Sequence, residues 1–177
     1  MAADAGTAVV ANGVKRSDPL LLFSRILESP LENAMKFETY GNCFVCGKNN
    51  PNGLRLSFEI DKEKQTLRTT FIASPTFQGW DGIVHGGIFS TLLDEAMAKL
   101  VYELGYQAVT ASLEIKFKKP APILEPLHVY GTITEVNKRL IRAKAHVANE
   151  DGTILATGTS NFLKHTSTQP FPSRGRE

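Results

Sequence analysis

Residues 82–105 read GIVHGGIFSTLLDEAMAKLVYELG, and this stretch predicts the central element of the fold. From residue 88 onward, apolar residues recur at intervals of three and four, which is the period of a helix face. They form two adjacent rows, Ile88, Leu92, Ala96, Leu100 and Leu104 beside Phe89, Leu93, Met97 and Val101. Because two rows exceed what a surface helix needs, we expect a largely buried helix of about 18 residues and about 27 Å, ending at Gly105.

Strands are predicted on both sides of this helix. Before it, residues 54–60 and 67–73 alternate apolar and polar side chains around a charged turn, which indicates an antiparallel hairpin, and residues 74–84 are a predicted loop. After it, turn signals separate four more predicted strands, at 109–118, 127–136, 140–148 and 154–163. The order β-β-α-β-β-β-β predicts an α+β fold in which an antiparallel sheet of five to six strands wraps around one long central helix.

The predicted domain covers residues 37–165. Residues 1–36 are expected to be an N-terminal extension, partly helical over 19–35 or mobile, and residues 166–177 a mobile tail. A single sheet covers only one side of the helix and leaves exposed edges. We therefore expect a second copy to supply the missing cover, giving a homodimer and, in the larger alternative, a dimer of dimers.

The composition excludes several classes of function. The chain has 177 residues, with 20 Lys and Arg against 18 Asp and Glu, for a net charge of +2. This balance argues against nucleic-acid binding, and no apolar run reaches the ~18 residues of a membrane span. Only two cysteines are present, which favours a reducing compartment. We expect a cytoplasmic protein, with a transit peptide as the alternative left open.

His85, Gly86 and Gly87 lead directly into the predicted helix. Successive glycines at a helix N-terminus expose backbone N–H groups, and the helix dipole adds partial positive charge there. Such a site holds an anionic oxygen, either a phosphate or the oxyanion of an acyl-transfer intermediate. The alternative is that the glycines only allow the loop and the helix to pack closely.

Asp94 is the unusual residue of the helix, because aspartate is a poor helix former and is rarely buried without a partner. Its neighbour Glu95 has an ordinary explanation, an ion pair with Lys99 four residues on. Asp94 has no such partner and stacks over Ser90. A carboxylate here, in a groove near the helix N-terminus, could activate water or attack a carbonyl carbon. The alternative is a solvated residue at the edge of the helix.

These residues carry a family resemblance. The chain resembles the hotdog-fold thioesterases of the phenylacetate-degradation type, on the motifs His85-Gly86-Gly87, Thr91-Leu92-Leu93-Asp94-Glu95-Ala96-Met97, Thr110, Lys119-Pro120 and Asp151-Gly152. The segments Cys43-Phe44-Val45-Cys46-Gly47 and Asn50-Pro51-Asn52-Gly53-Leu54 are similar to the lead-in of many members. The resemblance covers about residues 40–165 and supports the predicted fold.

The resemblance implies hydrolysis of acyl-CoA or aryl-CoA thioesters in a site built between two subunits. It gives Asp94 the role of base or nucleophile, and the backbone N–H of Gly86, with Gly87 beside it, the role of polarising the thioester carbonyl. Thr110 would position the attacking water. His85 completes the predicted catalytic set, although such a histidine more often anchors the loop than transfers protons.

Substrate binding is predicted for five further residues. Many members carry an asparagine ahead of the histidine, where this chain has Gln78, so Gln78 is the candidate substitute. Because CoA carries phosphates, basic residues are expected near the entrance, and Lys119 and Arg139 are the candidates. Ser90 and Glu95, which flank Asp94 on the helix, complete the set.

No cofactor and no metal ion are expected. Cys43 and Cys46 form a lone C-x-x-C pair, whereas a zinc site needs about four ligands. Metal binding would therefore require ligands from another subunit, and a structural turn is the favoured interpretation.

Two alternatives keep the fold and change the function. One is a hydratase or dehydratase acting on acyl thioesters, although those enzymes follow the histidine with Phe-Pro and not with Gly86-Gly87. The other is a non-catalytic module that binds an acyl or aromatic ligand between subunits. The sequence does not identify the acyl group of the substrate. It also does not decide whether Asp94 acts as a general base or as a covalent nucleophile.

Overall fold

A computed structural model describes residues 41–165, so the predicted helix at 19–35 and both terminal segments lie outside the described residues. The predicted order of the helix and of the six strands of the main sheet is confirmed, and a 3-10 helix and two short strands are added before the helix. The elements are β1 (Glu59–Asp61), β2 (Thr66–Ile72), a 3-10 helix (Pro75–Phe77), β3 (Gln78–Trp80), β4 (Ile83–Val84), α2 (Gly86–Glu103), β5 (Ala108–Phe117), β6 (Pro126–Val136), β7 (Leu140–Ala148) and β8 (Ile154–Lys164).

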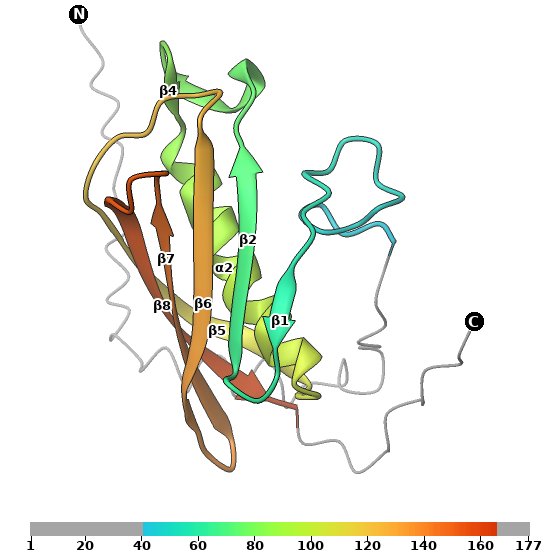
Figure 1. The fold of residues 1–177 in the computed structure, drawn as a ribbon. Helices are drawn as coiled ribbons and strands as arrows, with labels where there is room; N and C mark the ends of the chain where they lie inside the picture. The colour runs from blue at the N-terminus through green and yellow to red at the C-terminus, as the bar shows by residue number, and fades with distance from the viewer. Residues whose placement is uncertain (1–40, 166–177) are drawn as a thin grey trace, which may run out of the picture. The chain divides into compact units, whose positions relative to one another are not determined.

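Six of the strands form one antiparallel sheet that curves around α2. The strand order is β1-β2-β6-β7-β8-β5, which leaves β1 and β5 at the two edges. In Figure 1, β2 and β6 pass in front of the helix, and the sheet wraps around it. This is the predicted hotdog architecture, an antiparallel sheet around one long helix.

Local hydrogen bonds set both ends of α2. At its start, the Gly87 N–H donates to Nδ1 of His85 over 2.9 Å. At its end, Gly105 adopts φ +88°, and the N–H groups of Gly105 and Tyr106 donate back to the carbonyls of Tyr102 and Val101. This is a Schellman motif, which glycine favours because it has no Cβ. The predicted length of the helix and its end at Gly105 are confirmed.

The core lies between α2 and the concave face of the sheet. Both predicted apolar rows supply it, through Phe89, Leu92, Leu93, Ala96, Met97, Leu100 and Val101. The sheet approaches closely where its residues are small, since a Cβ on Gly131 would lie 3.3 Å from the carbonyl oxygen of Ala96. One side of the helix is therefore covered by direct contact with the sheet.

The first predicted strand is shorter than expected. Residues 54–60 alternate as a strand would, yet β1 covers only Glu59–Asp61. Arg55 adopts φ +53°, which interrupts extended backbone. The N–H groups of Leu54 and Leu56 donate to the carbonyls of Phe44 and Val45, so this segment pairs with the preceding loop and not with β2.

The predicted loop at 74–84 also differs, because it contains the 3-10 helix and the β3–β4 ladder. Gly82 turns the ladder at φ +72°, and its N–H donates to Oε1 of Gln78 over 3.2 Å. The His85 N–H donates to the carbonyl of Phe77. The segment is thereby folded back against the start of α2.

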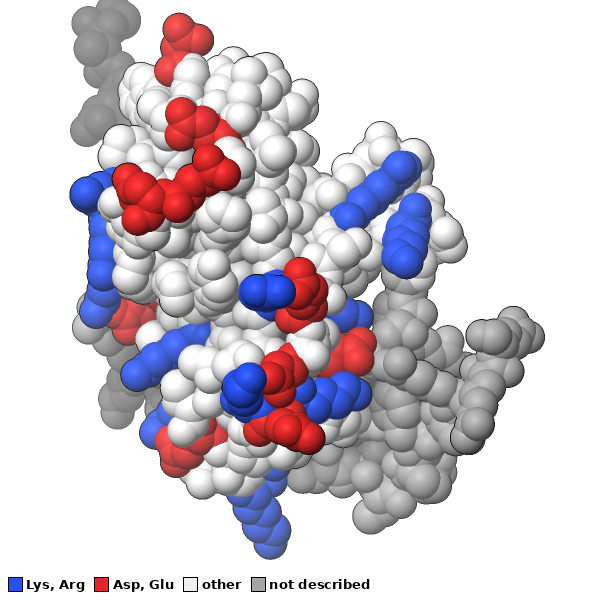
Figure 2. All heavy atoms as spheres, viewed as in Figure 1, with Lys and Arg blue, Asp and Glu red and all other residues white. Residues whose placement is uncertain are grey.

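The surface shown in Figure 2 mixes acidic and basic side chains, and its Lys and Arg residues form no continuous basic area. Within residues 41–165, no helix combines the length and the hydropathy needed to cross a membrane.

Candidate active site

The N-terminus of α2 offers one open backbone donor. The Gly87 N–H is already bonded to Nδ1 of His85. For the Gly86 N–H, in contrast, residues 41–165 supply no acceptor. Gly86 is half-buried, and the first turn of a helix directs its N–H groups out of the helix end. Of the two glycines predicted to bind an oxyanion, only Gly86 has its donor free.

His85 acts as the cap of the helix. Because its Nδ1 accepts a hydrogen bond, the proton of the neutral ring is on Nε2. The backbone of Gly79 lies against the ring, since a Cβ there would come within 2.9 Å of Cδ2. These contacts fix the loop, which agrees with an anchoring role for His85.

Asp94 has a partner on the neighbouring strand. The Thr110 hydroxyl, on β5, donates to Oδ1 of Asp94 over 3.0 Å. Burial raises the pKa of the Asp94 carboxyl, and the hydrogen bond from Thr110 partly opposes that rise. Two residues that are 16 positions apart are thus joined, and one carboxylate oxygen is held while the group stays partly accessible.

Gly86 and Asp94 of one chain lie too far apart to act on one carbonyl group. Eight residues separate them on α2, which is about 12 Å along the axis. An oxygen held by the Gly86 N–H lies beyond the helix end, farther still from Asp94. An attacking atom must come within about 3–3.5 Å of the carbonyl carbon. A site that uses both groups therefore needs two chains.

Phe117 lies beside Gly86 and was not among the predicted site residues. A Cβ on Gly86 would touch the Phe117 ring at 3.5 Å, and that ring packs edge-on against Phe89. Its exposed fraction is nevertheless 59%. The sequence places Phe117 on the inner face of its strand with Leu113 and Ile115. The alternation of apolar and polar residues does not reveal that Phe117, at the end of β5, is exposed and not buried in the core.

The structure does not gather the other predicted residues at one site. The side chains of Gln78 and Ser90 bond to backbone groups, Gly82 N–H and Gly86 C=O. Lys119 bonds through its N–H to Leu155 near the start of β8, whereas the Arg139 carbonyl bonds to Lys164 at the end of β8. Nine residues of strand separate these two ends, about 30 Å at 3.3 Å per residue. Lys119 and Arg139 of one chain cannot bind the same phosphate group.

Comparisons with known proteins agree with this architecture. Residues 81–156 match the family model of the thioesterase superfamily. A solved thioesterase superfamily protein covers 85% of this chain and 81% of its own, with a TM-score of 0.65 and 23% identity. The described domain therefore has the hotdog fold, which it shares with this solved thioesterase superfamily protein. The PaaI protein of the E. coli phenylacetic acid degradation operon shares the fold, with a TM-score of 0.60 and 18% identity over 67% of this chain and 83% of its own.

Among curated proteins, the chain is similar to the acyl-coenzyme A thioesterase THEM4 of Bos taurus. The two are 28% identical over 116 residues, which is 64% of this chain and 48% of the relative. The chain spans about half the length of the curated THEM4 proteins that it matches.

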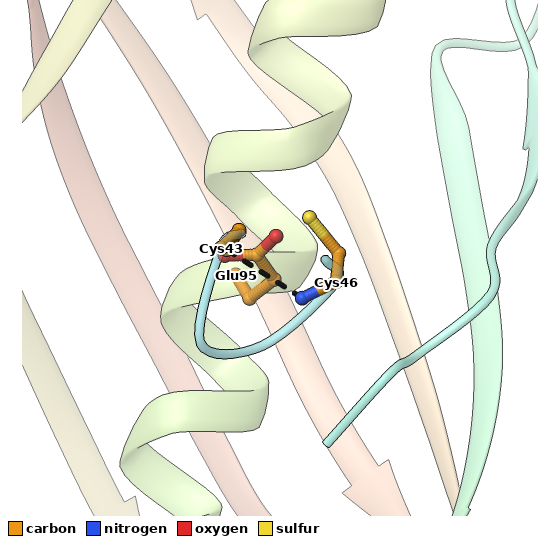
Figure 3. Close-up of side chains that lie close together, drawn as sticks. All are labelled: Cys43, Cys46 and Glu95. Atoms are coloured by element: carbon orange, nitrogen blue, oxygen red, sulfur yellow. Dashed lines mark hydrogen bonds between the residues drawn. The ribbon is translucent and has the colours of Figure 1, made fainter. Parts of the chain in front are cut away.

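Glu95 of this hotdog domain does not make the predicted ion pair. The Lys99 ammonium pairs with Glu103 over 3.2 Å. Glu95 instead lies beside Cys43 and Cys46, as Figure 3 shows. Burial raises the pKa of Glu95, while Cys46 and the charge of Lys99 lower it, and burial together with Glu95 raises the pKa of Cys46. A third potential ligand therefore lies beside the two cysteines on the same chain.

One groove of the hotdog domain does not include Asp94 among its lining residues. Its volume is about 940 Å³, and it includes outward-facing residues of the sheet such as Arg68, Tyr130, His146 and Thr157. None of the predicted site residues lines it. The groove therefore does not belong to the site around α2.

Proposed function

We propose that this chain hydrolyses the thioester bond of an acyl- or aryl-CoA to a free acid and CoA. Asp94 is the base or nucleophile, and the Gly86 N–H stabilises the oxyanion. The observation that carries the proposal is the half-buried Asp94 carboxylate, held by Thr110 on the central helix whose N-terminus carries the open Gly86 donor. The activity named for the THEM4 relatives supports the same reaction.

In this proposal the active site joins two copies of the chain. On one chain, Thr110 lies beside Asp94 near the start of β5, and Phe117 lies beside Gly86 at its end. As an edge strand, β5 has one side that pairs with no other strand of the described residues. Antiparallel pairing of β5 with β5 of a second copy brings the Asp94 end of one chain beside the Gly86 end of the other. The resulting homodimer has two equivalent sites, and a dimer of dimers would repeat them.

The chemistry follows from these positions. In the general-base route, Asp94 takes a proton from water while the water oxygen attacks the thioester carbon. The carbonyl oxygen becomes an oxyanion that accepts the N–H of Gly86 of the partner subunit. The C–S bond then breaks, and the sulfur leaves as the thiol of CoA with the proton. In the covalent route, the Asp94 carboxylate attacks the thioester carbon, the C–S bond breaks and CoA leaves as its thiolate. Water then hydrolyses the acyl-enzyme anhydride to the free acid and restores the Asp94 carboxylate, and the proton released ends on the CoA thiol.

Thiol release from a panel of short, medium, long and aryl acyl-CoAs tests this function. We expect turnover by the wild type and a loss of about a thousandfold in kcat for Asp94→Asn with the fold intact. Glu103→Gln is the matched control, because it removes another carboxylate of α2 while leaving the proposed site unchanged. Wild-type turnover by Asp94→Asn would contradict the mechanism. Formation of an enoyl product, or ligand-dependent stabilisation without thiol release, would replace it with one of the alternatives.

For its location we propose a reducing compartment, the cytoplasm, because Cys43 and Cys46 are both free thiols. Imaging of the full chain as a fluorescent fusion tests this, and a secretory location would contradict it.

A further inference from the structure

We propose that Cys43, Cys46 and Glu95 form a binding site for one divalent metal ion of the zinc type. Two thiol sulfurs and one carboxylate oxygen, one ligand atom from each residue, all lie within 4.8 Å of one another. Figure 3 shows the two cysteines on one loop, facing Glu95 of α2. The cluster lies outside the proposed catalytic set, so this inference does not depend on the proposed function.

The loop presents the sulfur of Cys43 as an acceptor. The backbone N–H groups of Val45 and Cys46 point at Cys43 Sγ, at 3.4 and 3.5 Å. These two donors hold the Cys43 sulfur in a fixed position on the loop. The tight turn depends on Gly47, because a Cβ there would lie 2.6 Å from the Gly41 carbonyl oxygen and would overlap the backbone of Cys43.

The loop is also fixed in place before any ion binds. The Gly47 N–H donates to the Cys43 carbonyl over 3.0 Å, and the Asn49 N–H to the Gly41 carbonyl over 2.7 Å. The side chains of Val45 and Leu56 are buried in the core. An ion would therefore bind to a largely preformed set of ligands, which reduces the ordering cost of binding.

The ligand types select the metal. Zinc binds cysteine sulfur at about 2.3 Å and carboxylate oxygen at about 2.1 Å in tetrahedral geometry, which places ligand atoms about 3.6–3.8 Å apart. The observed ligand atoms lie within 4.8 Å of one another, so the cluster would have to contract by about 1 Å to reach that spacing. Calcium and magnesium prefer oxygen ligands only, so the two sulfurs argue against them. Three protein ligands leave a fourth position for water.

Such an ion would join two parts of the domain. Cys43 and Cys46 belong to the segment before β1, and Glu95 lies in the middle of α2. Because metal binding to the folded state stabilises it, removal of the ion should lower the unfolding temperature of the full chain.

Cobalt titration of the reduced full-length protein tests the proposal, with Co²⁺ alone as the probe. We expect one equivalent to bind tightly and to produce a near-ultraviolet thiolate-to-cobalt charge-transfer band, which zinc then abolishes by displacement. The Cys43→Ser/Cys46→Ser variant should lose the band, and Glu95→Gln should weaken binding about tenfold or more. Glu103→Gln, a carboxylate on the same helix outside the cluster, should bind cobalt like the wild type.

If a variant fails to fold, the cobalt titration of the wild type by itself still tests the proposed site. Absence of the charge-transfer band in reduced, folded wild type would overturn the site. An unchanged affinity in folded Glu95→Gln would also overturn it as a three-ligand site. Metal analysis of protein purified without chelators should find about one zinc per chain.

Discussion

At the scale of single residues, the two adjacent glycines differ in what their N–H groups do. Gly87 donates to the ring of His85, whereas Gly86 has its donor free within the described residues. The sequence predicted that a glycine pair begins the helix, but it could not show which of the two N–H groups stays free to bind an oxyanion. That division depends on the position of the His85 ring, which accepts the Gly87 N–H and lies against the backbone of Gly79.

Replacing Gly86 by proline removes the proposed oxyanion donor. Gly86 is the first helical residue, where proline is tolerated, and His85 already has the extended backbone that precedes proline. We expect Gly86→Pro to fold and to lose about 10²–10³-fold in kcat. Gly86→Ala, which keeps the N–H and adds a Cβ at ordinary contact distance from Phe117, should retain most activity. Equal kinetics for the two variants would remove Gly86 from the mechanism.

Thr110 tests whether the hydrogen bond to Asp94 positions the carboxylate. We expect Thr110→Val to lower kcat about tenfold with little change in KM, because one hydrogen bond to a charged group is lost. Thr110→Ser keeps the hydroxyl and should stay near the wild type. Steady-state kinetics on the best acyl-CoA measures both, and a Thr110→Ser variant as impaired as Thr110→Val would point to packing instead.

Glu95 shows where reasoning from spacing fails. Lys99 has an acid four residues away on each side, and sequence spacing cannot choose between Glu95 and Glu103. The choice is tertiary, because the loop of residues 43–46 lies against Glu95. The contact between Asp94 and Thr110 was easier to anticipate, since the family resemblance had already placed a hydroxyl at the start of that strand.

At the scale of elements, periodicity predicted α2 and the four strands after it, because one face of each packs on the core. It overextended the first strand, where Arg55 leaves extended backbone, and it missed the β3–β4 ladder. That ladder is stabilised by single hydrogen bonds around Gly82 and has no buried face long enough to give a period. Short elements of this kind follow from local geometry and not from hydrophobic pattern.

The outer face of the sheet contains a pH-sensitive element, His146 on β7. Its ring stacks on Tyr130 of β6, and burial, with a smaller effect of the Lys118 charge, holds its pKa below the ordinary 6.5. The folded state thus favours neutral His146, and the unfolded chain binds the proton more readily. This contribution to stability is complete above about pH 6.5 and is lost as the pH falls through the folded pKa.

Denaturant unfolding across pH 8 to 5 should therefore show a smaller loss of stability for His146→Gln than for the wild type. The glutamine has no proton to gain, so the part of the pH dependence due to residue 146 disappears. Superimposable profiles for the two proteins would assign the acid sensitivity to other groups.

At the scale of the whole molecule, the separation of Gly86 and Asp94 decides how many chains a site needs. About 12 Å along α2 excludes joint action within one chain, and the edge position of β5 offers a way to pair two copies. The sequence already indicated a second copy, because one sheet cannot cover the whole helix. It could not indicate that catalysis itself would need both chains, because that conclusion rests on the geometry of α2.

Complementation between two inactive variants tests this account most directly. Asp94→Asn and Gly86→Pro chains are co-expressed with different tags, and thiol release is measured on the mixed dimers and on each parent. If Asp94 of one chain works with Gly86 of the other, each mixed dimer regains one intact site of two. A random mixture should then recover about a quarter of the wild-type activity. Mixed dimers that form and stay as inactive as their parents would contradict the shared site.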